Sequence, residues 1–169
     1  PVAVVTKNAL VTRDIDVLAD LARFDAAVVF ISITSLDADL AGKLEPRASR
    51  PEARLEAVKQ LTGAGIPVGV MIAPVIPGLN EPEIPAITRA VADAGARFAN
   101  YILLRLPHGV KDVFSQWLEA HYPLKKEKVL ADIRSTREGE LYRADFDQRM
   151  SGTGLRAEQI AQLFRVSLA

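Results

Sequence analysis

The stretch Ala26–Ile33, with the sequence AAVVFISI, decides the fold class. Nearly every residue in it is apolar, which is typical of a parallel strand that is covered on both faces. Three further apolar runs predict strands at Val2–Thr6, Ile66–Ile72 and Phe98–Leu106. Because segments with helical periodicity separate the four runs, the sequence predicts an α/β protein with a parallel sheet.

The segments between the predicted strands carry apolar residues at helical spacing. The first helix is predicted from about Thr12, and the second from Pro51, because proline suits the first turn of a helix. A third helix is predicted to stop at Gly95. The polar connection over residues 34–50 is longer than most loops between a strand and a helix, so it is a candidate functional loop.

The pattern changes after Pro107, where strands cease and only helical segments follow. We expect two domains: residues 1–107 as a partial parallel (β/α) barrel of about four strands, and residues 108–169 as a helical C-terminal extension. Four strands cannot close a barrel. The sequence leaves open whether the sheet is an open doubly wound one or pairs with a missing half.

The chain begins at Pro1, directly before the first predicted strand. We therefore expect it to be a piece of a larger barrel whose N-terminal half lies upstream. An uncovered sheet face or edge would then be exposed, and self-association through it is expected. A second copy of the chain could cover this surface in place of the missing half.

The composition excludes several classes of function. The chain has 21 basic and 21 acidic residues, so bulk attraction to nucleic acid or to an anionic membrane is not expected, although a local basic groove stays open. No apolar run reaches the roughly 20 residues that span a bilayer, so we expect no membrane partner and a cytoplasmic location. The absence of cysteine excludes disulfides, thiolate metal sites and iron–sulfur ligation within these residues.

Polar residues follow the predicted strands at their carboxyl ends, where parallel α/β folds collect their functional groups. Lys7 follows the first strand, Ser32 ends the second, and Arg105 lies at the end of the fourth. A lysine there could hold a carboxylate or a phosphate as a point charge, and a serine could bond to a ribose hydroxyl. Polar residues at strand ends usually belong to ordinary loop chemistry, which is the simpler explanation of each residue taken alone. The strand ends therefore predict a site but not a reaction.

Five blocks of the sequence together carry a family resemblance. They are TKNALVTRDIDVLADLA (Thr6–Ala22), the long block Phe30–Pro74, APVIPGLNEPEI (Ala73–Ile84), YILLRLP (Tyr101–Pro107) and RMSGTG (Arg149–Gly154). In this order and spacing the chain resembles the C-terminal part of the radical S-adenosylmethionine barrel. Within that superfamily it is most similar to the spore-photoproduct-lyase-like branch, whose uncharacterised members are often labelled DNA repair photolyases.

The resemblance implies contacts to S-adenosylmethionine at the first two strands. Lys7 occupies the place of the lysine that meets the methionyl carboxylate, and Ser32 the place of a residue on the ribose hydroxyls. Glu45 and Arg54 match polar positions after the second strand. Two roles stay open for them: a Glu–Arg pair, or an arginine that contacts the cofactor carboxylate.

The resemblance also implies contacts near the adenine ring. Pro74 and Val75 match the stretch that packs beside the adenine, and Arg105 closes the last strand that borders it. Together these positions would offer a cation, hydroxyl partners and an apolar slot for a flat ring.

The implied function is that of a radical enzyme. In the full-length protein a 4Fe-4S cluster would reductively cleave S-adenosylmethionine to a 5′-deoxyadenosyl radical, which acts on an unknown substrate, with nucleic acid as one candidate. The cluster-binding Cys-x3-Cys-x2-Cys loop and a glycine-rich segment have no counterpart here, and we expect both upstream of Pro1. We therefore expect this chain alone to be inactive. The alternative is a non-catalytic βα scaffold or a module that binds a small anionic ligand.

Overall fold

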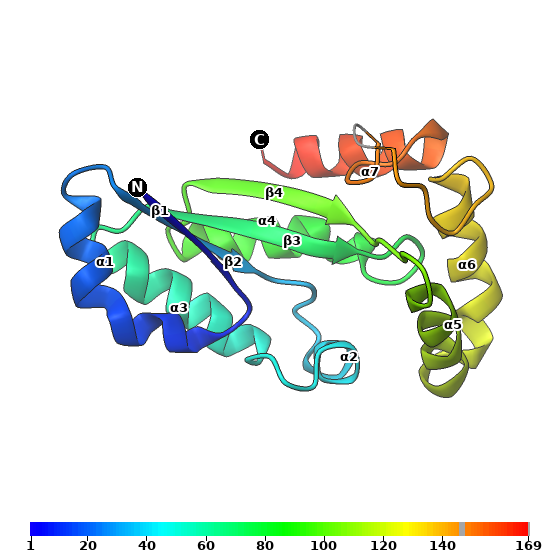
Figure 1. The fold of residues 1–169 in the computed structure, drawn as a ribbon, viewed down its shortest axis with the longest axis horizontal. Helices are drawn as coiled ribbons and strands as arrows, with labels where there is room; N and C mark the ends of the chain where they lie inside the picture. The colour runs from blue at the N-terminus through cyan, green and yellow to red at the C-terminus, as the bar shows by residue number, and fades with distance from the viewer. Residues whose placement is uncertain (146–147, 169) are drawn as a thin grey trace. The chain divides into compact units, whose positions relative to one another are not determined.

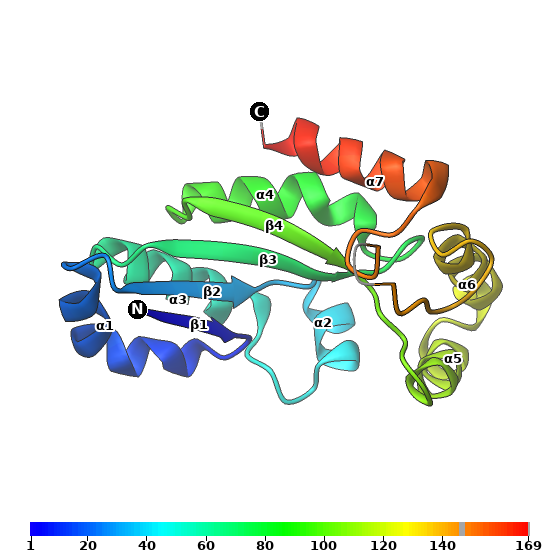
Figure 2. The same ribbon diagram turned by 45° about the horizontal axis from the view of Figure 1, so that its top comes forward.

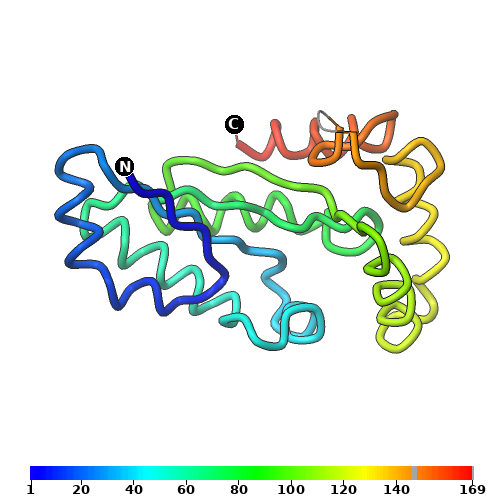
Figure 3. Tube along the Cα trace, in the orientation of Figure 1, coloured from blue at the N-terminus to red at the C-terminus, as the bar shows by residue number. Residues whose placement is uncertain are grey.

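The computed structural model describes residues 1–145 and 148–168. Four parallel strands form one sheet in the order β1-β2-β3-β4, as Figure 1 shows, and Figure 3 traces the chain through them. The strands are β1 (Val2–Thr6), β2 (Ala27–Ser32), β3 (Val68–Val75) and β4 (Phe98–Leu103). The predicted α/β class with a partial parallel barrel is thereby confirmed.

The α-helices are α1 (Ile15–Ala22), α2 (Ala38–Leu44), α3 (Pro51–Gly63), α4 (Ile84–Asp93), α5 (Val110–His121), α6 (Lys126–Ser135) and α7 (Gly154–Ser167). Short 3-10 turns precede α1, α4 and α6. Helix α3 starts at Pro51, as the sequence predicts. No helix in residues 1–145 and 148–168 is long and apolar enough to cross a membrane.

The described chain divides into two compact units. The first unit is Pro1–Ile72 together with Ala86–Asn100, and the second unit is Ala73–Pro85 together with the residues from Tyr101 onward. Both β3 and β4 contribute residues to each unit. The domain boundary near Pro107 stays a prediction.

The strand order places the connecting helices on one face of the sheet. Consecutive parallel strands joined by right-handed crossovers put each helix on the same side, whereas a doubly wound sheet reverses its strand order at a switch point. Figures 1 and 2 both show α1 and α3 on the same side of β1, β2 and β3. The arrangement is therefore that of a barrel wall, not of a doubly wound sheet.

Side-chain burial within the first unit follows this one-sided arrangement. Val29 and Ile31 on β2 are 0% and 1% exposed, and their neighbours Val68 and Val70 on β3 are also fully buried. On the opposite face of the sheet Val5 is 67% exposed. Successive side chains of a strand alternate between faces, so β1 and β2 present a covered face and an open face.

Gly69 on β3 allows an aromatic ring to lie flat on the open face. Gly69 is the register partner of Phe30 on β2. A Cβ added at Gly69 would lie 2.4 Å from Cε1 of Phe30, so the Phe30 ring would have to move. The glycine therefore makes room for the Phe30 ring in its present position beside β3.

Candidate functional site

The site in the first unit starts where β1 ends. Asn8 follows β1, and its side chain accepts a hydrogen bond from the Leu10 amide at 3.0 Å, which starts a 3-10 turn. Ser49 joins this corner from the connection before α3: its amide donates to the Lys7 carbonyl at 3.2 Å, and its hydroxyl accepts from the Ala9 amide at 2.9 Å. These contacts fix the backbone on both sides of Lys7.

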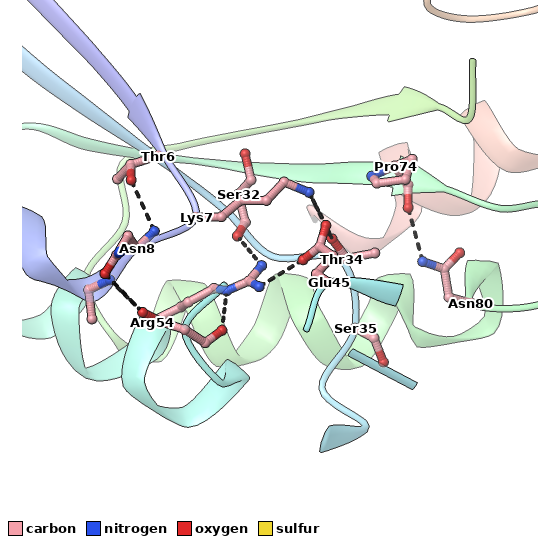
Figure 4. Close-up of polar contacts among 12 residues, drawn as sticks. Thr6, Lys7, Asn8, Ser32, Thr34, Ser35, Glu45, Arg54, Pro74 and Asn80 are labelled. Atoms are coloured by element: carbon pink, nitrogen blue, oxygen red, sulfur yellow. Dashed lines mark hydrogen bonds and ion pairs between the residues drawn. The ribbon is translucent and has the colours of Figure 1, made fainter. Parts of the chain in front are cut away.

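Glu45, at the end of α2, is the centre of the polar network drawn in Figure 4. One carboxylate oxygen accepts from the Lys7 ammonium and from the Thr34 hydroxyl, the latter at 2.9 Å. The other oxygen accepts from Nη2 of Arg54 at 2.7 Å. Nζ of Lys7 also lies 3.2 Å from Oγ1 of Thr34. The network therefore joins the ends of β1 and β2 to the connection between α2 and α3.

Arg54 is buried beneath this network, with a side chain only 2% exposed. Besides Glu45 it donates to two backbone carbonyls, from Nε to Ser49 at 2.7 Å and from Nη1 to Ser32 at 2.9 Å. The Glu–Arg pair that the sequence left as one of two roles is thus present in the structure. Arg54 ties the long connection to the end of β2.

The charges of the network do not cancel. Lys7 and Arg54 each carry a positive charge and Glu45 carries one negative charge, so one positive charge is left over. Burial alone would raise the pKa of Glu45, but the hydrogen bonds from Lys7 and Arg54 outweigh it and hold that pKa below its ordinary value. Glu45 is therefore ionised at neutral pH, and Lys7, with a side chain 35% exposed, is the cation that solvent reaches.

A pocket of about 410 Å³ opens beside Lys7. The residues that line it are Lys7, Asn8, Glu45, Pro46, Arg47 and Ala48. Ser32, which the sequence predicts as a site residue, is buried at the end of β2, and in Figure 4 its hydroxyl points away from Arg54. The first unit thus brings together Lys7, Glu45 and Arg54, while Ser32 joins them through its carbonyl.

The other predicted site residues belong to the second unit. The bond between Ala73 and Pro74 is cis. The Pro74 carbonyl accepts from the Asn80 side-chain amide at 3.0 Å, which Figure 4 also shows. Oδ1 of Asn80 accepts from the Ile76 amide at 2.6 Å, so this buried side chain closes the loop after β3. Val75 is fully buried, and its carbonyl accepts from the Leu104 amide at 2.8 Å.

Arg105 lies two residues beyond the end of β4. Its Nη1 contacts Sδ of Met150 at 4.0 Å, and its Nε is buried without a hydrogen-bond partner. Nothing in the second unit pairs Arg105 with a carboxylate among the described residues.

Sequence reasoning did not assign roles to three residues that hold these sites together: Thr34, Ser49 and Asn80. Each is a small polar residue in a loop beside a strand end, and each bonds to the backbone or to Glu45. For Thr34 and Asn80 the signal in the sequence is a position after an apolar strand, whereas Ser49, in the polar connection before α3, has no such signal. The described residues hold no group of three His, Cys, Asp or Glu side chains that could bind a metal ion.

Comparison with known families and proteins agrees with the fold. A family model described as the Radical SAM superfamily matches residues 1–91. The uncharacterized protein ORF301 of Acidianus two-tailed virus is 34% identical over 95 residues, which cover 53% of this chain and 31% of that protein. The uncharacterized protein Rv2578c of Mycobacterium tuberculosis is 29% identical over 125 residues, or 73% of this chain and 37% of that protein. The chain spans less than half the length of these relatives.

Solved structures of spore photoproduct lyase share the fold. A mutant with bound AdoMet and dinucleoside spore photoproduct superposes with a TM-score of 0.58 at 19% identity, covering 98% of this chain and 47% of that one. Another mutant of the same enzyme gives a TM-score of 0.59 with the same coverage. At this identity the likeness shows the fold and nothing further about the site.

Proposed function

Because the chain belongs to the radical SAM superfamily, we propose that its first unit binds S-adenosylmethionine and that the whole protein is a radical enzyme. In such an enzyme the bound cofactor supplies a 5′-deoxyadenosyl radical. The observation that carries the proposal is the surplus positive charge at Lys7, which lies at the end of β1 beside a pocket of about 410 Å³.

We assign the methionyl carboxylate to Lys7. The Lys7 side chain is 35% exposed, and its ammonium already has one carboxylate neighbour, Glu45, whose charge Arg54 also shares. A second carboxylate arriving from solvent would therefore meet a net positive site.

The other predicted site residues take different roles in this proposal. Arg54 is a positioning residue, since its side chain donates to Glu45 and to the backbone carbonyls of Ser32 and Ser49. Ser32 is proposed to meet the ribose. For the second unit, we propose that Pro74 and Val75 form the apolar stretch near the adenine, on the family resemblance alone.

The residues present do not fit an iron–sulfur cluster. The sequence contains no cysteine, and the described residues contain no cluster of other metal-binding side chains. We therefore assign no part of the cluster chemistry to this chain. In the proposal its ligands come from another part of a longer protein, in keeping with the 31% to 46% of its relatives' length that the chain spans.

The substrate of the whole protein is a separate part of the proposal. Spore photoproduct lyase, whose fold this chain shares, has been solved with a dinucleoside spore photoproduct. That likeness makes a nucleic acid one candidate for the substrate.

Calorimetric titration with S-adenosylmethionine tests the site. We expect weak binding to the unaltered chain, because only part of the cofactor site is present, and a loss of about tenfold or more in Lys7→Ala. Lys59→Ala is the matched control: Lys59 is exposed on α3, and the variant is expected to bind like the parent. Micromolar binding that survives in Lys7→Ala would contradict the assignment. No binding to the parent would favour the scaffold alternative.

A further inference from the structure

A second pocket, of about 340 Å³, lies within the second unit between β4 and the start of α7. The residues that line it are Tyr101, Ser151, Gly152, Thr153, Gly154, Ala157, Glu158 and Ala161. Half of them are glycine or alanine, so the walls leave room beside the larger side chains of Tyr101 and Glu158. None of the residues that we assign to S-adenosylmethionine lines this pocket, so it is a candidate for a different ligand.

The loop that forms one wall of this pocket is held in place by its backbone. The Leu103 amide donates to the Met150 carbonyl at 2.9 Å, which joins the loop to the end of β4. The Thr153 amide donates to the Thr136 carbonyl at 2.9 Å, which joins the loop to the end of α6. Gly152 allows this close approach, because a Cβ there would lie 2.9 Å from the Thr136 carbonyl oxygen. The wall is therefore preformed, as is usual in ligand pockets.

Tyr101 is the aromatic residue of the lining. Its ring packs against the Phe164 ring of α7, with the ring centroids 5.0 Å apart and the ring planes at 53°. Burial raises the pKa of the Tyr101 hydroxyl and outweighs the opposite effect of Arg165, so the phenol is neutral at neutral pH. The face of a tyrosine ring attracts cations. A positively charged ligand is therefore favoured on this side of the pocket.

Glu158 is the one charged side chain among the described residues that line the pocket. It is exposed, and its carboxylate has no ion-pair or hydrogen-bond partner within residues 1–145 and 148–168. Arg156, on the same helix, pairs with Glu81. The other arginine of α7, Arg165, donates to the Gln162 side chain at 2.7 Å. The lining therefore carries one negative charge that no neighbouring cation is seen to pair with.

We propose that this pocket binds a small organic amine in its protonated form. The ammonium donates charge-assisted hydrogen bonds to Glu158 and lies near the face of Tyr101. The carbon part of the ligand packs against Ala157 and Ala161. Thr153 offers a further acceptor, because its side chain stands at the N-cap of α7 without making the capping bond that is usual there. The proposal does not depend on the S-adenosylmethionine site.

An NMR titration of the chain with benzylamine tests the proposal, with benzyl alcohol as the uncharged probe of similar shape. We expect benzylamine to shift the amide signals of residues 151–161 in a saturable way, and benzyl alcohol to bind about tenfold more weakly. Glu158→Gln should abolish the preference for the amine. Tyr101→Leu should weaken benzylamine binding about threefold. Glu158 is exposed, so its variant stays informative even if the Tyr101 variant fails to fold.

The controls separate this pocket from other acidic surfaces and from the cofactor site. Glu127→Gln, at an exposed position on α6, should bind benzylamine like the parent, and so should Lys7→Ala. Butylamine, used in parallel, distinguishes two forms of the ligand: equal affinity indicates an alkyl amine, and weaker binding than benzylamine indicates an aromatic amine. Absence of saturable shifts, equal binding of benzylamine and benzyl alcohol, or an unchanged preference in Glu158→Gln would overturn the proposal.

Discussion

At the scale of single residues, Glu45 decides how the site in the first unit is held. Its two oxygens take bonds from Lys7, Thr34 and Arg54, so one carboxylate links two strand ends to a connection that is distant in sequence. Lys7 is thereby oriented by a partner and is not a free loop lysine. The positioning of Lys7 therefore depends on the ionised state of Glu45.

The titration of Glu45 should appear in the pH dependence of stability. Because its pKa is lower in the folded protein, its contribution is fully present above the ordinary value near 4.5 and is lost as the pH falls through the folded value. We expect Glu45→Gln to be less stable than the parent at pH 7, with the difference shrinking below about pH 4. Urea unfolding at a series of pH values measures this. A difference that is constant from pH 7 to pH 3 would contradict the role of the charge.

The sequence predicted Lys7, Glu45 and Arg54 as site residues, and they lie in one network. It could not say which of the two roles Arg54 takes, because that depends on where the backbone carbonyls of Ser32 and Ser49 lie. Those carbonyls are placed by the tertiary fold. Arg137 was misjudged for the same reason: in the sequence it is one of several basic residues in a helical segment, which favours a solvated helix face, whereas the fold buries it.

At the scale of elements, α2 is the feature that the sequence did not predict. It lies inside the polar connection over residues 34–50, and it is only seven residues long, too short for a clear apolar stripe. The Asp37 side chain caps it by accepting from the amides of Asp39 and Leu40, at 2.8 and 3.3 Å. The cap matters because Glu45 directly follows the last residue of α2, so the position of Glu45 depends on this helix.

Removing the Asp37 cap should destabilise α2 and so lower the stability of the protein by a modest amount. We expect Asp37→Ala to lower the free energy of unfolding by about 1 kcal/mol, because two amides at the start of the helix lose their acceptor. Asp37→Asn keeps an acceptor and should stay close to the parent. Urea unfolding of the three proteins checks the prediction. Equal stability of the parent and the alanine variant would show that the cap does not support this helix.

The strands were predicted more accurately than the loops at their ends. β1 has the expected bounds, and β2 differs by one residue at each end. β3 extends to Val75 through residues that the sequence assigned to a loop, and β4 stops at Leu103 before the expected Leu106. Apolar runs fix where a buried strand lies, but the last residues of a strand depend on which neighbour continues the pairing.

At the scale of the whole molecule, the open face of β1 and β2 is the feature from which we predict behaviour in solution. Val5 is 67% exposed on it, and β1 ends the strand order, so one edge has no partner strand among the described residues. An exposed apolar edge is a surface on which another chain can pair. The sequence predicted such a surface from the count of strands, whereas the side on which the helices lie required the strand order.

Self-association should follow from this edge. We expect the apparent mass of the chain in light scattering to rise with concentration and to fall back toward the monomer in Val5→Lys, which adds a charge to the edge. Val17→Lys is the control, since Val17 is also exposed but lies on α1. A parent that stays monomeric over the whole concentration range, with no binding of an apolar dye, would contradict the prediction.

The most direct test of the central claim compares S-adenosylmethionine with its decarboxylated form on the parent chain and on Lys7→Ala. If Lys7 holds the methionyl carboxylate, the parent should prefer the carboxylated ligand by about tenfold, and the variant should bind both forms equally weakly. A variant that keeps the full preference would contradict the claim, because the carboxylate would then be recognised by another group.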